Sequence, residues 1–276
     1  MSECEFDELK VYRGDDMVIT DDIVVKQPTI AQIADFGERK YFSAVHTLTA
    51  VGADLKWQLC DYAGIDYTEI DDYELFVKFI SQLVSSRKRV HKELVDNPEY
   101  AEQLDGLSED ELDAMLVNPL ELTLNVDLAD FIPCMNNDAE QVVLYDVEHD
   151  ITIDRPTYIR MVGAVRQIHG FKRNNEMPAN EITKMDLIDD AREEAMRNAN
   201  KPYKSILKPL ISALSVKTGM CGDKRIWDMP VGMFFDSIKR ANKIQDSQLL
   251  LQGAYSGFAS LKGVDSDRLN WTGDIS

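Results

Sequence analysis

The chain has 276 residues and carries 49 Asp and Glu against 30 Lys and Arg, a net charge of −19. Hydrophobic residues make up 44%, which is typical of a globular protein and excludes a disordered one. No apolar run approaches the ~18 residues of a membrane span, and the acidic N-terminus lacks the apolar stretch of a secretory signal. We therefore expect a soluble cytoplasmic protein. Its widely spaced cysteines favour reduced thiols over a disulfide framework or a zinc site: Cys4, Cys60, Cys134 and Cys221.

The negative charge is unevenly distributed along the chain. Residues 93–154 contain 18 acidic residues and no Lys or Arg, whereas residues 155–276 contain 14 acidic and 19 basic residues. Such a segment repels nucleic-acid phosphates and attracts basic proteins. A solubilising segment with no partner is the simpler interpretation. The partner-binding hypothesis rests on five side chains: Asp105, Glu109, Asp110, Glu111 and Asp113.

The N-terminal and middle regions alternate between strand and helix patterns. β-Branched residues at 17–19 and 23–25 predict a short hairpin. Helical periodicity then predicts a helix over 53–63, closed by Gly64, and another that starts near Asp71. Further strands are expected at three places: residues 121–126, 142–145 and 151–153.

The last region, 155–276, has helical patterns throughout. Asp154 is a candidate N-cap, with Pro156 in the first turn of a helix that ends before Gly170. Pro230 opens a long final helix. A charged helix between these two is expected to turn four apolar side chains inward: Ile182, Met185, Ile188 and Ala195.

These patterns predict a mainly α fold of the α+β class. Residues 1–92 form a hairpin plus helices, residues 93–154 form an acidic middle segment with short strands, and residues 155–276 form a helical region. The sheet elements are expected within residues 12–30 and 120–154.

The sequence contains none of the usual catalytic motifs. Nucleotide-binding glycine loops, nucleophile elbows and the HExxH and CxxC patterns are all absent. His149-Asp150 is the kind of pair that some metal-dependent hydrolases use, but it falls in an expected turn without further ligands. His169 at a helix C-terminus is expected to be a partly buried histidine stabilised by the helix dipole. We expect no enzymatic activity, no metal and no cofactor.

Short sequence motifs along the chain resemble a family of prophage-encoded proteins from low-GC Gram-positive bacteria. The resemblance spans about residues 12–275, apart from residues 84–116, which have the character of an insertion. It implies a tail-morphogenesis protein similar to the tail assembly chaperones, with the tape-measure or tail-tube protein as its partner. The motifs are Pro28–Ile30, Asp35–Gly37, Gly64–Glu69, Thr152–Arg155, His169–Lys172, Lys208–Ser212, Tyr255–Phe258 and Leu269–Trp271.

Three other functions fit the same sequence. One is a structural virion subunit of the tail or baseplate, with the virion as its location. Another is an acidic interaction protein that mimics nucleic acid and binds a host protein. A hydrolase with an unrecognised metal site is the last. Neither nucleic acid nor membrane is expected as a partner.

The charge hypothesis leads to a direct test. Replacing Asp105, Glu109, Asp110, Glu111 and Asp113 with Asn or Gln is expected to slow association with the tape-measure or tube protein. The salt dependence of that association is expected to weaken too, because charge attraction acts mainly on the association rate. Stopped-flow binding at low and moderate salt measures both effects. Unchanged rates at both salts would leave the segment a solubilising one.

Overall fold

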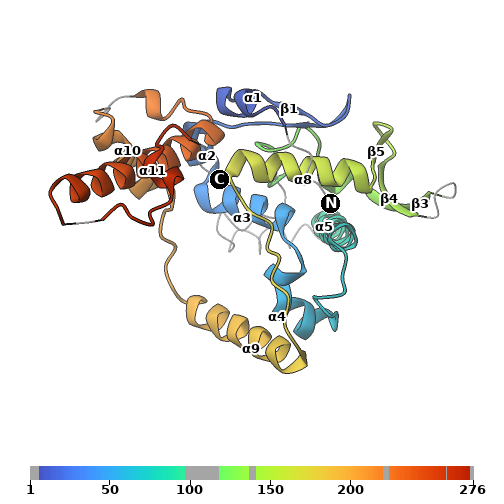
Figure 1. The fold of residues 1–276 in the computed structure, drawn as a ribbon. Coiled ribbons are helices and arrows are strands. Elements are labelled where there is room, and N and C mark those ends of the chain that lie inside the picture. The colour runs from blue at the N-terminus through green and yellow to red at the C-terminus, as the bar shows by residue number, and fades with distance from the viewer. Residues whose placement is uncertain (1–5, 97–117, 137–140, 220–223, 259, 274–276) are drawn as a thin grey trace.

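The structure is a computed structural model that describes residues 6–96, 118–136, 141–219, 224–258 and 260–273 (Figure 1). The protein is mainly α-helical with two small antiparallel sheets, which confirms the predicted fold class. In chain order its elements are α1 (Glu8–Arg13), β1 (Met17–Val18), β2 (Val24–Val25), α2 (Ile30–Phe36), α3 (Glu38–Thr49), a 3-10 turn (Gly52–Leu55), α4 (Lys56–Gln58), a π-helical turn (Leu59–Ala63), α5 (Asp72–Asp96), a 3-10 turn (Leu128–Asp130), β3 (Ile132–Asn136), β4 (Gln141–Asp146), β5 (Ile151–Ile153), α8 (Arg155–His169), α9 (Glu181–Asn198), α10 (Leu207–Lys217), a 3-10 turn (Lys224–Ile226), α11 (Val231–Tyr255) and α12 (Ser266–Leu269).

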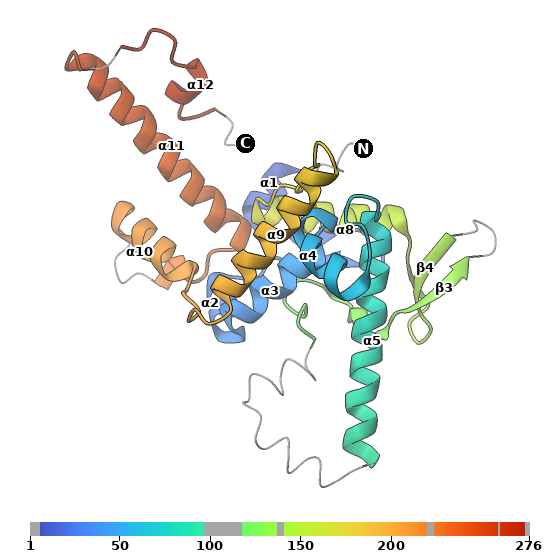
Figure 2. The ribbon, with the colours of Figure 1, turned by 90° about the horizontal axis from the view of Figure 1, so that it is seen from below.

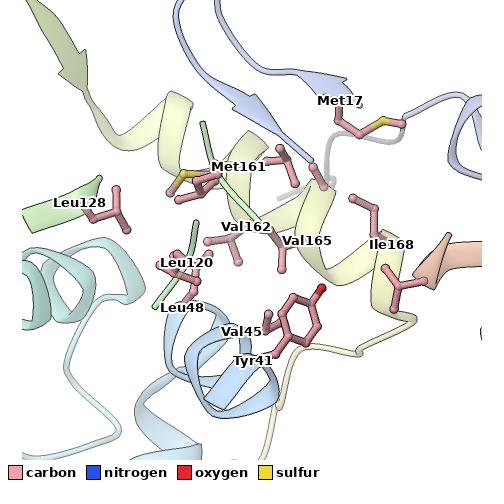
Figure 3. Close-up of a cluster of buried hydrophobic side chains, with 14 of the residues drawn as sticks. Met17, Tyr41, Val45, Leu48, Leu120, Leu128, Met161, Val162, Val165 and Ile168 are labelled. Carbon is pink, nitrogen blue, oxygen red and sulfur yellow. The ribbon is translucent and has the colours of Figure 1, made fainter. Parts of the chain in front are cut away.

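Helix α8 lies at the centre of the molecule and is buried on most sides. Its N-terminus is capped as predicted, because Asp154 accepts a hydrogen bond of 2.9 Å from the Thr157 N–H and Pro156 follows in the first turn. Gly170 ends the helix in the left-handed conformation that favours glycine, with φ of 64°. Helix α8 contacts α3, α5, α11 and β2. Figure 3 shows its apolar side chains interleaved with those of α3 and the hairpin.

The predicted first hairpin is present, and an irregular segment lies beside it. Met17 pairs with Val25 and Val18 with Val24. The strand expected at residues 121–126 is wrong: most of this segment forms turns, with a single bridge from Leu124 to Val25. The alternating pattern is overridden by local hydrogen bonds, since the N–H groups of Thr123 and Leu124 both donate to the Leu120 carbonyl at 2.8 Å.

The second sheet has the order β3-β4-β5, and its β4–β5 hairpin is the one predicted. Strand β3 was missed because Pro133 and the polar Asn136 interrupt its apolar pattern. Both sheets fall within the residue ranges expected for them. In the described part of residues 155–276 every regular element is a helix.

The first turn of α11 is fixed to the N-terminal region by backbone hydrogen bonds. The Val231 N–H donates to the Pro28 carbonyl at 2.9 Å, and the Ile30 N–H donates to the Met229 carbonyl at 3.0 Å. Gly14 (φ 88°) packs against the ring of Pro230, where a side chain would collide. Residues from the two ends of the chain are therefore joined at this point.

Helix α9 packs against α4 and the π-helical turn, forming a second, smaller core. The helix predicted over 53–63 consists of 3-10, α and π turns, and it ends at Gly64 as expected. The inward-facing stripe predicted for α9 is wrong in part. Ile188 is buried, but Ile182 is 75% exposed and Met185 is also exposed. A single turn of apolar contact is enough here because ion pairs hold the rest of the helix.

The main core takes buried side chains from all three regions distinguished in the sequence, from Val11 through Leu124 to Phe234. Of the four cysteines, Cys60 and Cys134 have free thiols, while Cys4 and Cys221 lie outside the described residues. Among the helices that the structure describes, none combines the length and apolar character of a transmembrane span.

His169 is deeply buried and neutral, which corrects the expectation of a partly buried histidine favoured by the dipole. Its Nδ1 lies 2.7 Å from the Val165 carbonyl, which can only accept, so Nδ1 carries the proton. The Tyr41 hydroxyl then donates to Nε2 at 2.7 Å. Burial lowers the pKa of His169 to about 4, and the Val165 hydrogen bond offsets only part of this effect.

Acid is therefore expected to destabilise the fold through His169. The unfolded chain binds its proton near pH 6.5 and the folded chain only near pH 4, so the free energy of unfolding falls across this window, by up to about 3 kcal/mol. Chemical denaturation at pH 7.5, 6, 5 and 4 measures the slope. His169→Gln is expected to flatten it, whereas His149→Gln, which removes a histidine whose pKa Asp146 raises, is expected to steepen it between pH 6 and 7.5. Equal slopes in wild type and His169→Gln would contradict the prediction.

Candidate functional site

The acidic side chains proposed from the sequence to bind a partner, Asp105, Glu109, Asp110, Glu111 and Asp113, lie outside the described residues. Other acids of residues 93–154 have local structural roles. Asp154 caps α8, and Asp127 accepts from Arg87 at 2.6 Å. Asp146 is buried and bonds His149 at 2.7 Å, which raises the pKa of His149.

The basic residues of the C-terminal region pair with carboxylates of the N-terminal region. Arg192 binds Asp61 through two hydrogen bonds of 2.7 and 2.8 Å, and Lys184 contacts Asp66 at 2.8 Å. Arg155, the first residue of α8, contacts Asp71. Each of these pairs joins the C-terminal region to a carboxylate within residues 61–72.

The most exposed apolar surface is the C-terminal arm, which we define as residues 205–273. Helix α11 projects from the body, with α10 beside its base and α12 near its far end (Figure 2). The arm carries four exposed aromatic side chains, of which Tyr255 and Phe258 are 90% and 94% exposed. Exposed aromatic residues are typical of protein-binding surfaces. The large exposed apolar residues here are Ile206, Val216, Trp227, Leu249, Tyr255, Phe258 and Trp271.

Glu38 at the start of α3 positions helix α10. Its Oε1 accepts from the N–H groups of Ile206 and Leu207 at 2.6 and 2.7 Å. These are N–H groups that a helix start leaves without intrahelical partners. Burial alone would raise the pKa of Glu38, but hydrogen bonds from Ser205 and the two N–H groups outweigh it and lower the pKa. The ionised carboxylate thus fixes α10 to the body.

A groove of about 690 Å³ runs between α10 and α11. Leu210, Leu214 and Ile238 line it with apolar surface, and Val216 at its edge is 69% exposed. Lys217 spans the groove, donating to the Ala241 carbonyl and to Gln245. An amphipathic helix has the shape and chemistry to occupy such a groove.

Polar contacts hold residues 268–273 to the middle of α11. Arg240 donates to the carbonyls of Trp271 and Gly273 at 2.7 Å, and Ser247 donates to the Leu269 carbonyl at 3.0 Å. Arg268 forms an ion pair with Asp246. The contacts that attach the end of the chain to α11 are thus polar ones.

The described residues contain no group of three or more His, Cys, Asp or Glu side chains placed to hold a metal ion. His149 and Asp150 lie in the β4–β5 turn, as expected, and each has a local partner. Asp150 accepts from the Tyr145 hydroxyl at 2.8 Å, and His149 bonds Asp146.

No family model, curated protein or solved structure matches this chain. The fold and the arm therefore carry the functional argument without support from a relative.

The C-terminal arm was missed as a site because its apolar residues have helical spacing, which favours a buried stripe. Phe234 at the base is indeed fully buried. Beyond it, the run Leu249–Leu251 and the aromatic tail no longer follow one face of a helix. The available signal was therefore a stretch that stays apolar but no longer places its apolar residues on one face of a helix.

The role of Glu38 leads to a stability prediction. Glu38→Gln removes the charge that accepts the first N–H groups of α10, and helix-capping interactions of this kind contribute about 1 kcal/mol. We expect a loss of about that size in denaturant unfolding, with faster amide hydrogen exchange in α10. The exposed Glu69→Gln is the matched control and should change neither. Protection of α10 equal to wild type in Glu38→Gln would show that other contacts fix this helix.

Proposed function

We propose that this protein is a phage tail-morphogenesis factor that acts as a tail assembly chaperone. Its partner is the tape-measure or tail-tube protein, held before assembly in the host cytoplasm. The observation that carries the proposal is the apolar C-terminal arm, which projects from the body with its aromatic residues exposed (Figure 2). The resemblance of the sequence to prophage tail proteins supplies the setting.

The arm has the properties that temporary protein binding requires. Exposed apolar surface of this kind promotes aggregation unless a partner covers it. The α10–α11 groove suits an amphipathic helix, and the aromatic residues beyond it can provide strongly contributing contacts. The end of the chain is attached to α11 by polar bonds and not by core packing. The exposed apolar side chains of the arm can therefore face a partner while the core stays packed.

The acidic segment provides a complementary role. Residues 93–154 carry 18 acidic residues and no Lys or Arg, so this segment attracts a partner with basic surface and speeds the encounter. In this proposal the acidic segment, through Asp105, Glu109, Asp110, Glu111 and Asp113, accelerates association, and the arm supplies affinity.

The arm leads to a binding prediction. We expect the triple variant Val216→Ser, Tyr255→Ser, Phe258→Ser to bind the tape-measure or tube protein of the same prophage at least tenfold more weakly, since each lost anchor costs on the order of 1 kcal/mol or more. Calorimetry or surface plasmon resonance with purified proteins measures this. Because these side chains lie outside the core, far-UV circular dichroism and thermal melting should stay at wild-type values.

A matched control removes exposed apolar residues elsewhere. Val18→Ser with Tyr62→Ser changes side chains that are also exposed but lie on the body. This variant is expected to bind like wild type. Equal weakening by both variants, or by neither, would contradict a site on the arm.

A virion subunit would use the same arm as a permanent interface, and purified virions separate the two roles. A chaperone is absent from mature particles, whereas a subunit is present in fixed stoichiometry. Mass spectrometry of virions, with and without the triple variant, therefore decides between them.

A further inference from the structure

A large cavity lies away from the arm, between the start of α5, the exposed side of α8 and the segment that follows Gly170. Its volume is about 950 Å³. This is within the range of small-molecule sites and is larger than a bare ion needs. Its walls carry six charged side chains: Asp71, Asp72, Arg155, Arg166, Lys172 and Arg173.

The two carboxylates in this cavity are already paired. Asp71 accepts from Arg155 at 2.7 Å, and Asp72 accepts two bonds from Arg173 at 2.8 and 3.0 Å. Two cations, Arg166 and Lys172, therefore remain without a carboxylate partner among the residues that the structure describes. Lys172 is exposed at the cavity wall, whereas Arg166 is buried.

Arg166 is the less easily explained of the two, because its side chain is only 9% exposed. Its one hydrogen bond to a described residue runs from Nη2 to the Thr49 carbonyl at 2.8 Å. A guanidinium has five N–H donors, so most of them lack a described partner. The C-terminal dipole of α8 favours a cation here but provides no second acceptor. A buried charge in this position is stable when an anion compensates it.

Tyr158 adds a neutral donor to the same cavity. Its ring is 4% exposed, and its hydroxyl makes no hydrogen bond with any described residue. Burial raises its pKa, and Tyr158 lines the cavity together with the charged side chains of Asp71, Asp72, Arg166 and Arg173. The hydroxyl thus keeps its proton and can donate it to an acceptor in the cavity.

We propose that this cavity binds the oxyanion of a small organic molecule, a phosphate or carboxylate group held by Arg166, Lys172 and the Tyr158 hydroxyl. A guanidinium fork matches either oxyanion by paired hydrogen bonds. The remaining volume, beside Ile159, Val162 and Phe171, accepts the organic part of the molecule. This site is independent of the arm and of the chaperone proposal.

The test uses the full chain and three probes, inorganic phosphate, phenyl phosphate and benzoate, at constant ionic strength set with sodium chloride. Isothermal titration calorimetry and thermal melting report binding. We expect saturable binding, with phenyl phosphate tighter than inorganic phosphate because of the apolar wall. The relative affinities of phenyl phosphate and benzoate distinguish a phosphate site from a carboxylate site.

Three variants locate the site. Lys172→Ala, Arg166→Lys and Tyr158→Phe are each expected to weaken phenyl phosphate binding about tenfold, as loss of a hydrogen bond to a charged group does. Arg166→Lys keeps the buried charge and Tyr158→Phe keeps the ring, so both variants preserve most of the packing. Lys262→Ala, an exposed lysine on the arm, makes the same charge change as Lys172→Ala and should leave affinity unchanged.

The proposal is overturned if none of the three probes gives saturable binding to folded wild-type protein. It is equally overturned if binding occurs but Lys172→Ala weakens it no more than Lys262→Ala does. In that case the anion is attracted by general charge and not by the cavity.

Discussion

Burial of helix α8 on most of its surface is the constraint on which the rest of the structure depends. Eight of its fifteen residues are buried, more than one apolar stripe provides, so several elements have to cover it. Two of the eight, Arg166 and His169, are polar and need partners inside the protein. Both find them on α3, through the Thr49 carbonyl and the Tyr41 hydroxyl. The α3–α8 pair is accordingly specified by polar as well as apolar contacts.

Charge is organised around this core in two separate systems. Carboxylates between Asp61 and Asp72 pair with cations of the C-terminal region and hold α9 and the segment after Gly170 against the body. Exposed pairs of this type contribute only about 0–1 kcal/mol each, so their role is mainly orientation. In the described part of residues 93–154 the pairs are made with other neighbours, Asp127 with Arg87 and Asp146 with His149.

Local signals made much of the fold predictable. The Asp154 cap, Pro156 and Gly170 bound α8 correctly because each acts through its own backbone neighbours. The alternating pattern at residues 121–126 predicted a strand, but hydrogen bonds to the Leu120 carbonyl form turns there instead. Ile182 was predicted to face inward, but ion pairs hold α9 with little apolar contact, and this side chain is exposed. The anion cavity could not be predicted at all. Arg166 and Lys172 are left as the two cations without a described carboxylate partner because Asp71 and Asp72 pair with Arg155 and Arg173. These ion pairs join residues far apart in the sequence, so the sequence pattern does not reveal them.

The backbone pairing of Pro28 and Ile30 with the first turn of α11 also bears on how the chain folds during synthesis. Val231 and Phe234 are fully buried in the main core, against residues from the first fifth of the chain. Translation proceeds from the N-terminus, so Ile30 and Val11 emerge about two hundred residues before the side chains that cover them. Contacts this distant in sequence slow folding because a long loop has to close first. The core therefore closes only after Val231 and Phe234 have been synthesised, and the nascent chain carries uncovered apolar surface until then.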